Sequence, residues 1–73
     1  MPTYRDYPES DPRHHTIQMR DRFHDLASHL RDDVNKIDDP QAMALFETAA
    51  EVIDGLDSAF KHYEAKSEAA WQA

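Results

Sequence analysis

Histidine is the reactive residue type that stands out in this chain of 73 residues. The five histidines are His14, His15, His24, His29 and His62. Two of them follow an aspartate at helical spacing, because Asp21 precedes His24 by three residues and Asp25 precedes His29 by four. Such pairs share one helix face, and imidazole and carboxylate groups are ligands for transition metals. One hypothesis is therefore a metal-binding helical bundle, with Asp21, His24, Asp25 and His29 as candidate ligands.

The apolar periodicity of the chain argues against that metal site. It places Asp21, Asp25 and His29 on the outside of the predicted helix, whereas the ligands of a bundle metal site point inward. A solvated helix surface with local ion pairs is the alternative interpretation. We expect no cofactor on this second interpretation.

Nucleophilic catalysis has little support in the sequence. The chain has no cysteine, and Ser28 and Ser58 fall on regular helix without a neighbouring base or oxyanion site. A small hairpin also lacks the deep cleft in which an enzyme shifts a pKa. We therefore expect a non-enzymatic protein.

The chain is acidic, with 15 Asp and Glu against 8 Lys and Arg and a net charge of −7. Binding to nucleic acid or to an anionic membrane depends on clustered Lys and Arg, so neither is expected. Glu47, Glu51 and Asp54 form an outer acidic stripe in the second half of the chain. This stripe predicts solubility alone, docking of a basic protein, or an antagonist that mimics nucleic acid. No apolar run approaches the ~20 residues of a membrane span and no signal peptide is evident, so we expect a cytoplasmic protein.

Two repeated start signals predict an all-α, antiparallel two-helix hairpin. Asp11-Pro12 and Asp39-Pro40 each combine a capping side chain with a proline suited to the first helical position. We expect helices over 12–37 and 40–71, joined by a turn at 38–39 that is short enough to force the helices antiparallel. Residues 1–10 contain two prolines and no helical period, which predicts an extended or disordered arm before the hairpin at 11–73.

Both predicted helices carry a row in alternating steps of three and four residues, the spacing of a heptad seam. The row is Thr16, Arg20, Phe23, Ala27, Leu30, Val34 and Ile37 in the first helix, and Ala42, Phe46, Ala49, Ile53, Leu56, Phe60, Tyr63, Ser67 and Ala70 in the second. A two-residue turn gives facing residues whose numbers sum to about 80, which sets Phe23 beside Leu56. The same register predicts one cross-helix charge pair, His24 with Asp57.

A second apolar row flanks this seam on one side and contains Met19, Leu26, Leu45, Val52 and Ala59. One hairpin covers only the central seam, so this row would stay in water unless another hairpin packs on it. A chain this short also seldom gains more than about 3–5 kcal/mol from its own core. We therefore expect a homodimer that forms a four-helix bundle. Its predicted interface is Met19, Phe23, Leu26, Leu30, Leu45, Val52, Ile53, Leu56, Ala59 and Phe60.

Two aromatic segments lie outside the paired part of the predicted hairpin. The second helix outruns the first beyond about Lys66, so Trp71 has no opposite residue, and the arm carries Tyr4 and Tyr7. Trp71 is expected to pack on the arm, on a second subunit or on another partner. With the acidic stripe, the candidate partner-binding residues are Tyr4, Tyr7, Glu47, Glu51, Asp54 and Trp71.

The segment from Thr16 to Tyr63 resembles the Rop family of plasmid copy-number regulators, through its capped helices, its very short turn and its opposed large and small seam residues. The resemblance implies a dimer of hairpins. Rop proteins bind paired RNA hairpins through a cation-bearing face of their first helices, whereas the corresponding face here presents Asp21, Asp25 and Asp32. The resemblance therefore extends to architecture and not to activity. The function expected from the sequence is a regulatory or adaptor module that works through protein contacts.

Overall fold

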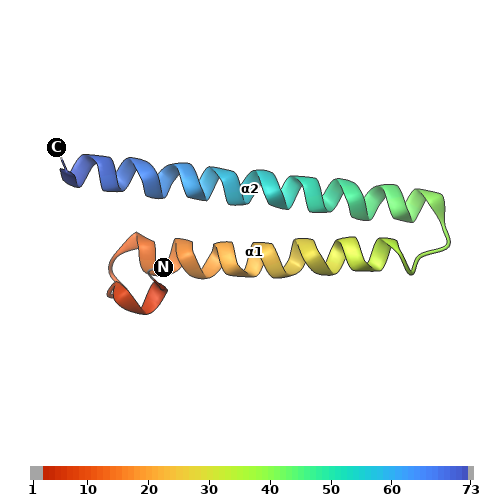
Figure 1. Cartoon of the computed structure of the whole chain (residues 1–73), viewed down its shortest axis with the longest axis horizontal. Helices are drawn as coiled ribbons and strands as arrows, with labels where there is room; N and C mark the ends of the chain where they lie inside the picture. Colours follow the sequence, from red (N-terminus) through yellow and green to blue (C-terminus); the bar gives the residue numbers. More distant parts are fainter. Residues whose placement is uncertain (1–2, 73) are drawn as a thin grey trace.

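The chain forms an antiparallel hairpin of two long helices (Figure 1). The computed structural model describes the backbone of residues 3–72 and the side chains of residues 3–66. A short 3₁₀ helix, η1 (Tyr4–Asp6), precedes α1 (Pro12–Val34) and α2 (Pro40–Gln72), and no strand occurs within the described backbone. The predicted all-α hairpin is confirmed. None of the described helices combines the length and the apolar character needed to cross a membrane.

Both helices begin where the two Asp-Pro pairs predict. Asp11 has an extended backbone conformation, and its carboxylate accepts a hydrogen bond from the Arg13 amide at 2.9 Å. Asp39 caps α2 in the same way and accepts a hydrogen bond from the Gln41 amide at 3.0 Å. Each proline occupies the first helical position, where an amide hydrogen would have no partner within the helix.

The connection between the helices differs from the prediction. α1 ends at Val34, three residues before its predicted end, and the connection spans residues 35–39 in place of the expected two residues. The Asn35 amide bonds the carbonyl three residues before it at 3.2 Å, which tightens the last turn. The reason lies at the start of α2. Pro40 disfavours a helical conformation for Asp39, so the chain needs more non-helical residues to reverse its direction.

The contacts between the helices agree with the predicted register at one pair and differ at another. His24 meets Asp57 as predicted. The rings of Phe23 and Phe60 meet edge to face with their centroids 5.3 Å apart, whereas the predicted neighbour of Phe23 is Leu56. Figure 1 shows the start of α2 reaching beyond the end of α1, because the connection continues outward before it turns back.

The surface of α2 that faces α1 combines most of the predicted seam with a second row beside it. The predicted seam residues Ala42, Phe46, Ala49, Ile53 and Phe60 are half-buried. Side chains at least half-buried on α2 include Met43, Phe46, Ala50, Ile53, Asp57, Phe60 and Glu64, again in steps of three and four. Ala50 is fully buried, while Leu56 and Tyr63 of the predicted seam are 45% and 47% exposed. Leu56 and Tyr63 therefore lie at the edge of the contact with α1, where they stay exposed. The interior is small, because Ala27, Val34 and Ala50 are the buried residues among those described.

The N-terminal arm, predicted to be extended or disordered, is folded onto the start of α1 over its described residues. The Asp6 carboxylate accepts a hydrogen bond from the amide three residues before it at 2.8 Å, which closes η1. The ring of Tyr4 meets that of His14 edge to face at 5.2 Å, and the Arg13 guanidinium lies 4.1 Å from the centre of the Tyr7 ring. These contacts join the arm to α1 and leave no periodic pattern in the arm itself, so the sequence does not signal them.

Candidate functional site

One side of the hairpin carries an apolar face, named here the open face. It combines the predicted second row with Leu56 and Tyr63, the two exposed residues of the predicted seam. Its exposed members are Met19, Leu26, Leu45, Val52, Leu56, Ala59 and Tyr63. The α2 members recur at heptad spacing and so form one stripe along that helix. The other residues of the predicted interface, Phe23, Leu30, Ile53 and Phe60, are half-buried.

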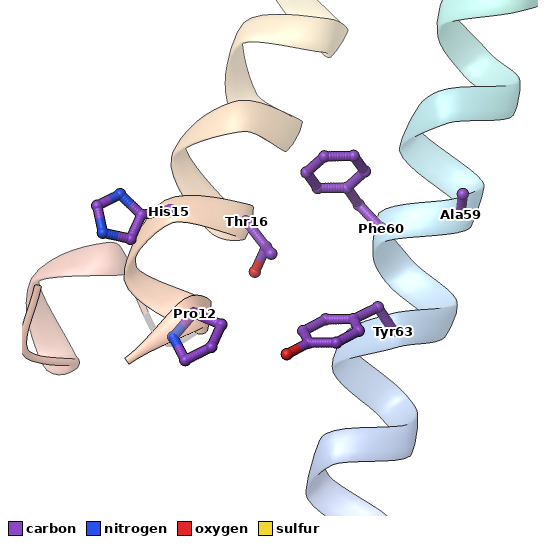
Figure 2. A pocket seen from close by; sticks show the side chains of 6 residues that line it. All are labelled: Pro12, His15, Thr16, Ala59, Phe60 and Tyr63. Atoms are coloured by element: carbon purple, nitrogen blue, oxygen red, sulfur yellow. The ribbon is translucent and has the colours of Figure 1, made fainter. Parts of the chain in front are cut away.

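The open face contains a hollow of about 560 Å³ at the end near the arm (Figure 2). Its lining residues are Pro12, His15 and Thr16 of α1 and Ala59, Phe60 and Tyr63 of α2. Figure 2 shows the rings of Phe60 and Tyr63 extending from α2 toward α1. The Nε2 atom of His15 lies 2.7 Å from the Glu9 carbonyl oxygen, so this polar ring is engaged by the arm. The hollow therefore suits an apolar side chain.

The opposite flank of the hairpin is ionic. Arg20 of α1 reaches two carboxylates of α2, Asp57 at 2.8 Å and Glu64 at 2.9 Å. All three side chains are partly buried, so water and salt screen these pairs less than pairs on an open surface. The Glu64 Oε1 atom is buried and accepts no hydrogen bond from the described residues.

Two further cross-helix pairs extend this ionic flank. The Nε2 atom of His24 lies 2.9 Å from Asp57 Oδ2, which confirms the predicted charge pair. Arg31 forms a hydrogen-bonded ion pair with Asp54. Burial acts to raise the pKa of Asp57, but the hydrogen bonds from Arg20 and His24, together with their charges, hold that pKa below its ordinary value. The hydrogen bond to Asp57 in turn raises the pKa of Arg20, against the effect of burial.

The four candidate metal ligands do not converge on one point. His24 is paired across the hairpin, and His29 lies 3.3 Å from Asp33. Asp21 and Asp25 are exposed. Across the part of the chain that the structure describes, no three His, Cys, Asp or Glu side chains are grouped as metal ligands would be.

The aromatic candidates for partner binding are engaged within the chain or lie outside the described side chains. Two adjacent histidines of α1 hold the arm, because each ring has a nitrogen close to an arm carbonyl oxygen, His14 at 2.9 Å and His15 at 2.7 Å. Tyr4 and Tyr7 are consequently half-buried. Trp71 belongs to the last turn of α2, and its side chain lies outside the described residues.

The acidic candidates are more accessible. Glu47 and Glu51 are exposed on α2. Asp54 is exposed as well, but Arg31 holds its carboxylate. The acidic stripe available to another molecule is therefore shorter than the sequence suggested.

No protein-family model, curated protein or solved structure matches the chain. The open face, the hollow and the ionic flank are therefore the features from which a function of this chain can be inferred.

The bridge from Arg20 to Asp57 and Glu64 was not predicted from the sequence. A signal was present, since Arg20 is a cation inside a heptad row and a partly buried cation requires a partner. Asp57 and Glu64 lie seven residues apart on the heptad row that also contains Ala50. Their choice as partners depends on how α2 is rotated about its own axis, which the sequence pattern did not determine.

Proposed function

We propose that two copies of this chain pack their open faces together into a four-helix bundle that acts as a non-enzymatic regulatory or adaptor module. The open face carries the proposal. It leaves six large apolar side chains exposed on a hairpin whose buried residues, among those described, are two alanines and one valine. Such a core is too small to supply much stability on its own, and burying the open face would supplement it.

The open face has the area that a stable dimer needs. The 23 residues of α1 span about 35 Å, because a helix rises about 1.5 Å per residue. Two helices side by side, each about 10 Å across with its side chains, are about 20 Å wide. Contact over this length and width buries about 700 Å² per copy and about 1,400 Å² in total, within the range of about 1,200–2,000 Å² for stable complexes.

A second copy of the chain matches this face well. The members of the open face are all uncharged, so two such faces can meet without burying a charge. Identical faces also have equal length and the same apolar character, and a two-fold axis buries both at once. The paired hairpins then enclose one core between four helices.

The dimer is tested by placing charge on the open face. Leu45→Glu combined with Val52→Glu should give a monomer, because association would bury unpaired carboxylates. The matched control, Ala44→Glu combined with Ser58→Glu, adds the same charge at exposed positions outside the open face and should stay dimeric. Sedimentation equilibrium at micromolar concentration measures the mass of each protein. A helical wild-type chain with the mass of one copy would contradict the proposal, as would glutamate variants that dimerise equally well.

The adaptor role rests on the surfaces that such a dimer leaves outside. Glu47 and Glu51 are exposed on α2, and charge complementarity favours a basic protein as their partner. Affinity capture from the native host should recover a basic protein with the wild type and lose it with Glu47→Lys/Glu51→Lys. The control Asp21→Lys/Asp25→Lys reverses the same number of charges on α1 and should retain it. Loss with both variants, or with neither, would exclude a specific role for the acidic surface.

A further inference from the structure

We infer that the two hairpins of the dimer point in opposite directions, so that Leu45 of each copy packs into the hollow of the other. The inference rests on the proposed homodimer and adds the relative orientation of its two halves. It starts from the difference between the two ends of the open face. Leu45, which is 65% exposed, projects at the end near the connection, and the hollow lies at the end near the arm.

The spacing along α2 allows the two features to meet. Leu45 precedes Tyr63 by 18 residues, a separation of about 27 Å along the helix. The midpoint between them along α2 is at the level of residue 54. A two-fold axis that crosses α2 at this level places Leu45 of one copy over Ala59–Tyr63 of the other. The same axis lays the whole length of one α2 stripe over the other, with Val52 next to Leu56 of the second copy. Full overlap of the faces and packing of Leu45 into the hollow therefore require the same position of the axis.

The parallel arrangement, with both connections at one end, does not fill the hollow. It would place the two hollows at the same end of the bundle and both copies of Leu45 at the other end. A hollow that no side chain of the partner enters forfeits the apolar contacts that its lining could make. The opposite orientation places in each hollow a leucine side chain that is otherwise left in water.

The charge distribution permits α2 to lie against α2. The net acidity of this helix would oppose the contact if carboxylates bordered the stripe. The positions spaced by seven residues on the outer border of the stripe are Gln41, Thr48, Gly55 and His62, none of which carries a carboxylate. A side chain added at Gly55 would meet nothing within 4 Å in the hairpin, so this border is also narrow and open. Glu47 and Glu51 lie farther around the helix.

A distance between the two connections tests the orientation. The chain has no cysteine, so Asp38→Cys accepts a single nitroxide spin label at the exposed connection. Pulsed electron spin resonance on the full chain should give an intermolecular distance of about 45 Å or more, since each connection lies about 24 Å along the helix from the two-fold axis. A distance of about 20 Å would overturn the inference and leave the homodimer in place. Absence of intermolecular coupling together with the mass of one copy would overturn the homodimer itself.

A size exchange tests the contact between Leu45 and the hollow. Leu45→Ala should weaken self-association at least about tenfold by removing the side chain that packs into the hollow, and Ala59→Leu should weaken it because the added leucine competes with Leu45 for the same part of the hollow. Both residues are exposed in the single hairpin, so helical content should not change. The double variant should recover most of the affinity, because the added leucine occupies the space that Leu45 leaves. Strictly additive losses would show that the two positions do not meet.

Discussion

Arg20 occupies a position that the heptad pattern assigns to the interface between the helices, yet it binds two carboxylates of α2. The distances of 2.8 Å to Asp57 and 2.9 Å to Glu64 make it the centre of the ionic flank. Its aliphatic stem can cover apolar surface while the guanidinium stays at the edge. Because the three charges are partly buried, removing Arg20 takes away the cation that holds Glu64 and leaves Asp57 with His24.

Replacement of Arg20 by alanine should therefore lower the free energy of unfolding by about 2–3 kcal/mol. Urea denaturation at a fixed protein concentration measures the change. Arg22→Ala removes an exposed cation from the same helix and should change the free energy by less than about 0.5 kcal/mol. Equal effects of the two variants would show that the bridge contributes no more than an exposed charge does.

The lowered pKa of Asp57 predicts a specific dependence of stability on pH. A carboxyl group with a lower pKa in the folded chain than in the unfolded chain stabilises the fold above its unfolded pKa of about 3.9, and this contribution disappears as the pH falls through the folded pKa. Asp57→Asn should thus be less stable than the wild type at pH 7, and the difference should narrow below about pH 4. Urea unfolding across pH 2–7 gives the two curves. Parallel curves would contradict the prediction, and the exposed-site variant Asp21→Asn serves as the control.

Local sequence signals predict where the two helices begin but not where α1 ends. Asp-Pro pairs determine where α1 and α2 begin, because capping and the proline conformation involve only neighbouring residues. The end of α1 depends instead on how the connection reaches Pro40. The conformation of the arm likewise depends on residues outside it, because His14 and His15 hold the arm through backbone carbonyls seven and six residues away.

The cap of α2 can be tested against its neighbour in the connection. Asp39→Ala removes the acceptor for the Gln41 amide and should lower the free energy of unfolding by about 1 kcal/mol. Asp38→Ala removes an exposed carboxylate one residue earlier and should have little effect. Urea denaturation of both variants gives the comparison. A loss of the same size for Asp38→Ala would point to charge in the connection, and not to capping, as the cause.

The whole molecule is a hairpin with more apolar surface outside than its own interior can accommodate. Leu56 and Tyr63 lie at the edge of the contact with α1 and join the residues of the second row on the open face. Their exposure therefore enlarges the face that is available to a second copy. In the proposed dimer, folding and association would be one process.

Thermal stability should consequently depend on protein concentration. A hundredfold increase in concentration should raise the melting temperature of the wild type by about 5–10 °C, because mass action favours the dimer. Circular dichroism at several concentrations measures the shift. The Leu45→Glu/Val52→Glu variant should melt at a lower temperature that does not change with concentration. A wild-type melting temperature that is constant over the same range would argue for a hairpin that is stable alone.

The helical class, both helix starts and the outward position of the second apolar row could be predicted from the sequence, because capping and apolar period involve neighbouring residues or residues one turn apart. The antiparallel register also predicted the pairing of His24 with Asp57. The contact of Phe23 with Phe60, the burial of Ala50, the Arg20 bridge and the folded arm are known only from the tertiary structure. α2 carries two overlapping heptad rows that share Phe46, Ile53 and Phe60, and the second row contains the two carboxylates that bind Arg20. Only the path of the connection and the contacts between distant residues select which side chains of these rows face α1.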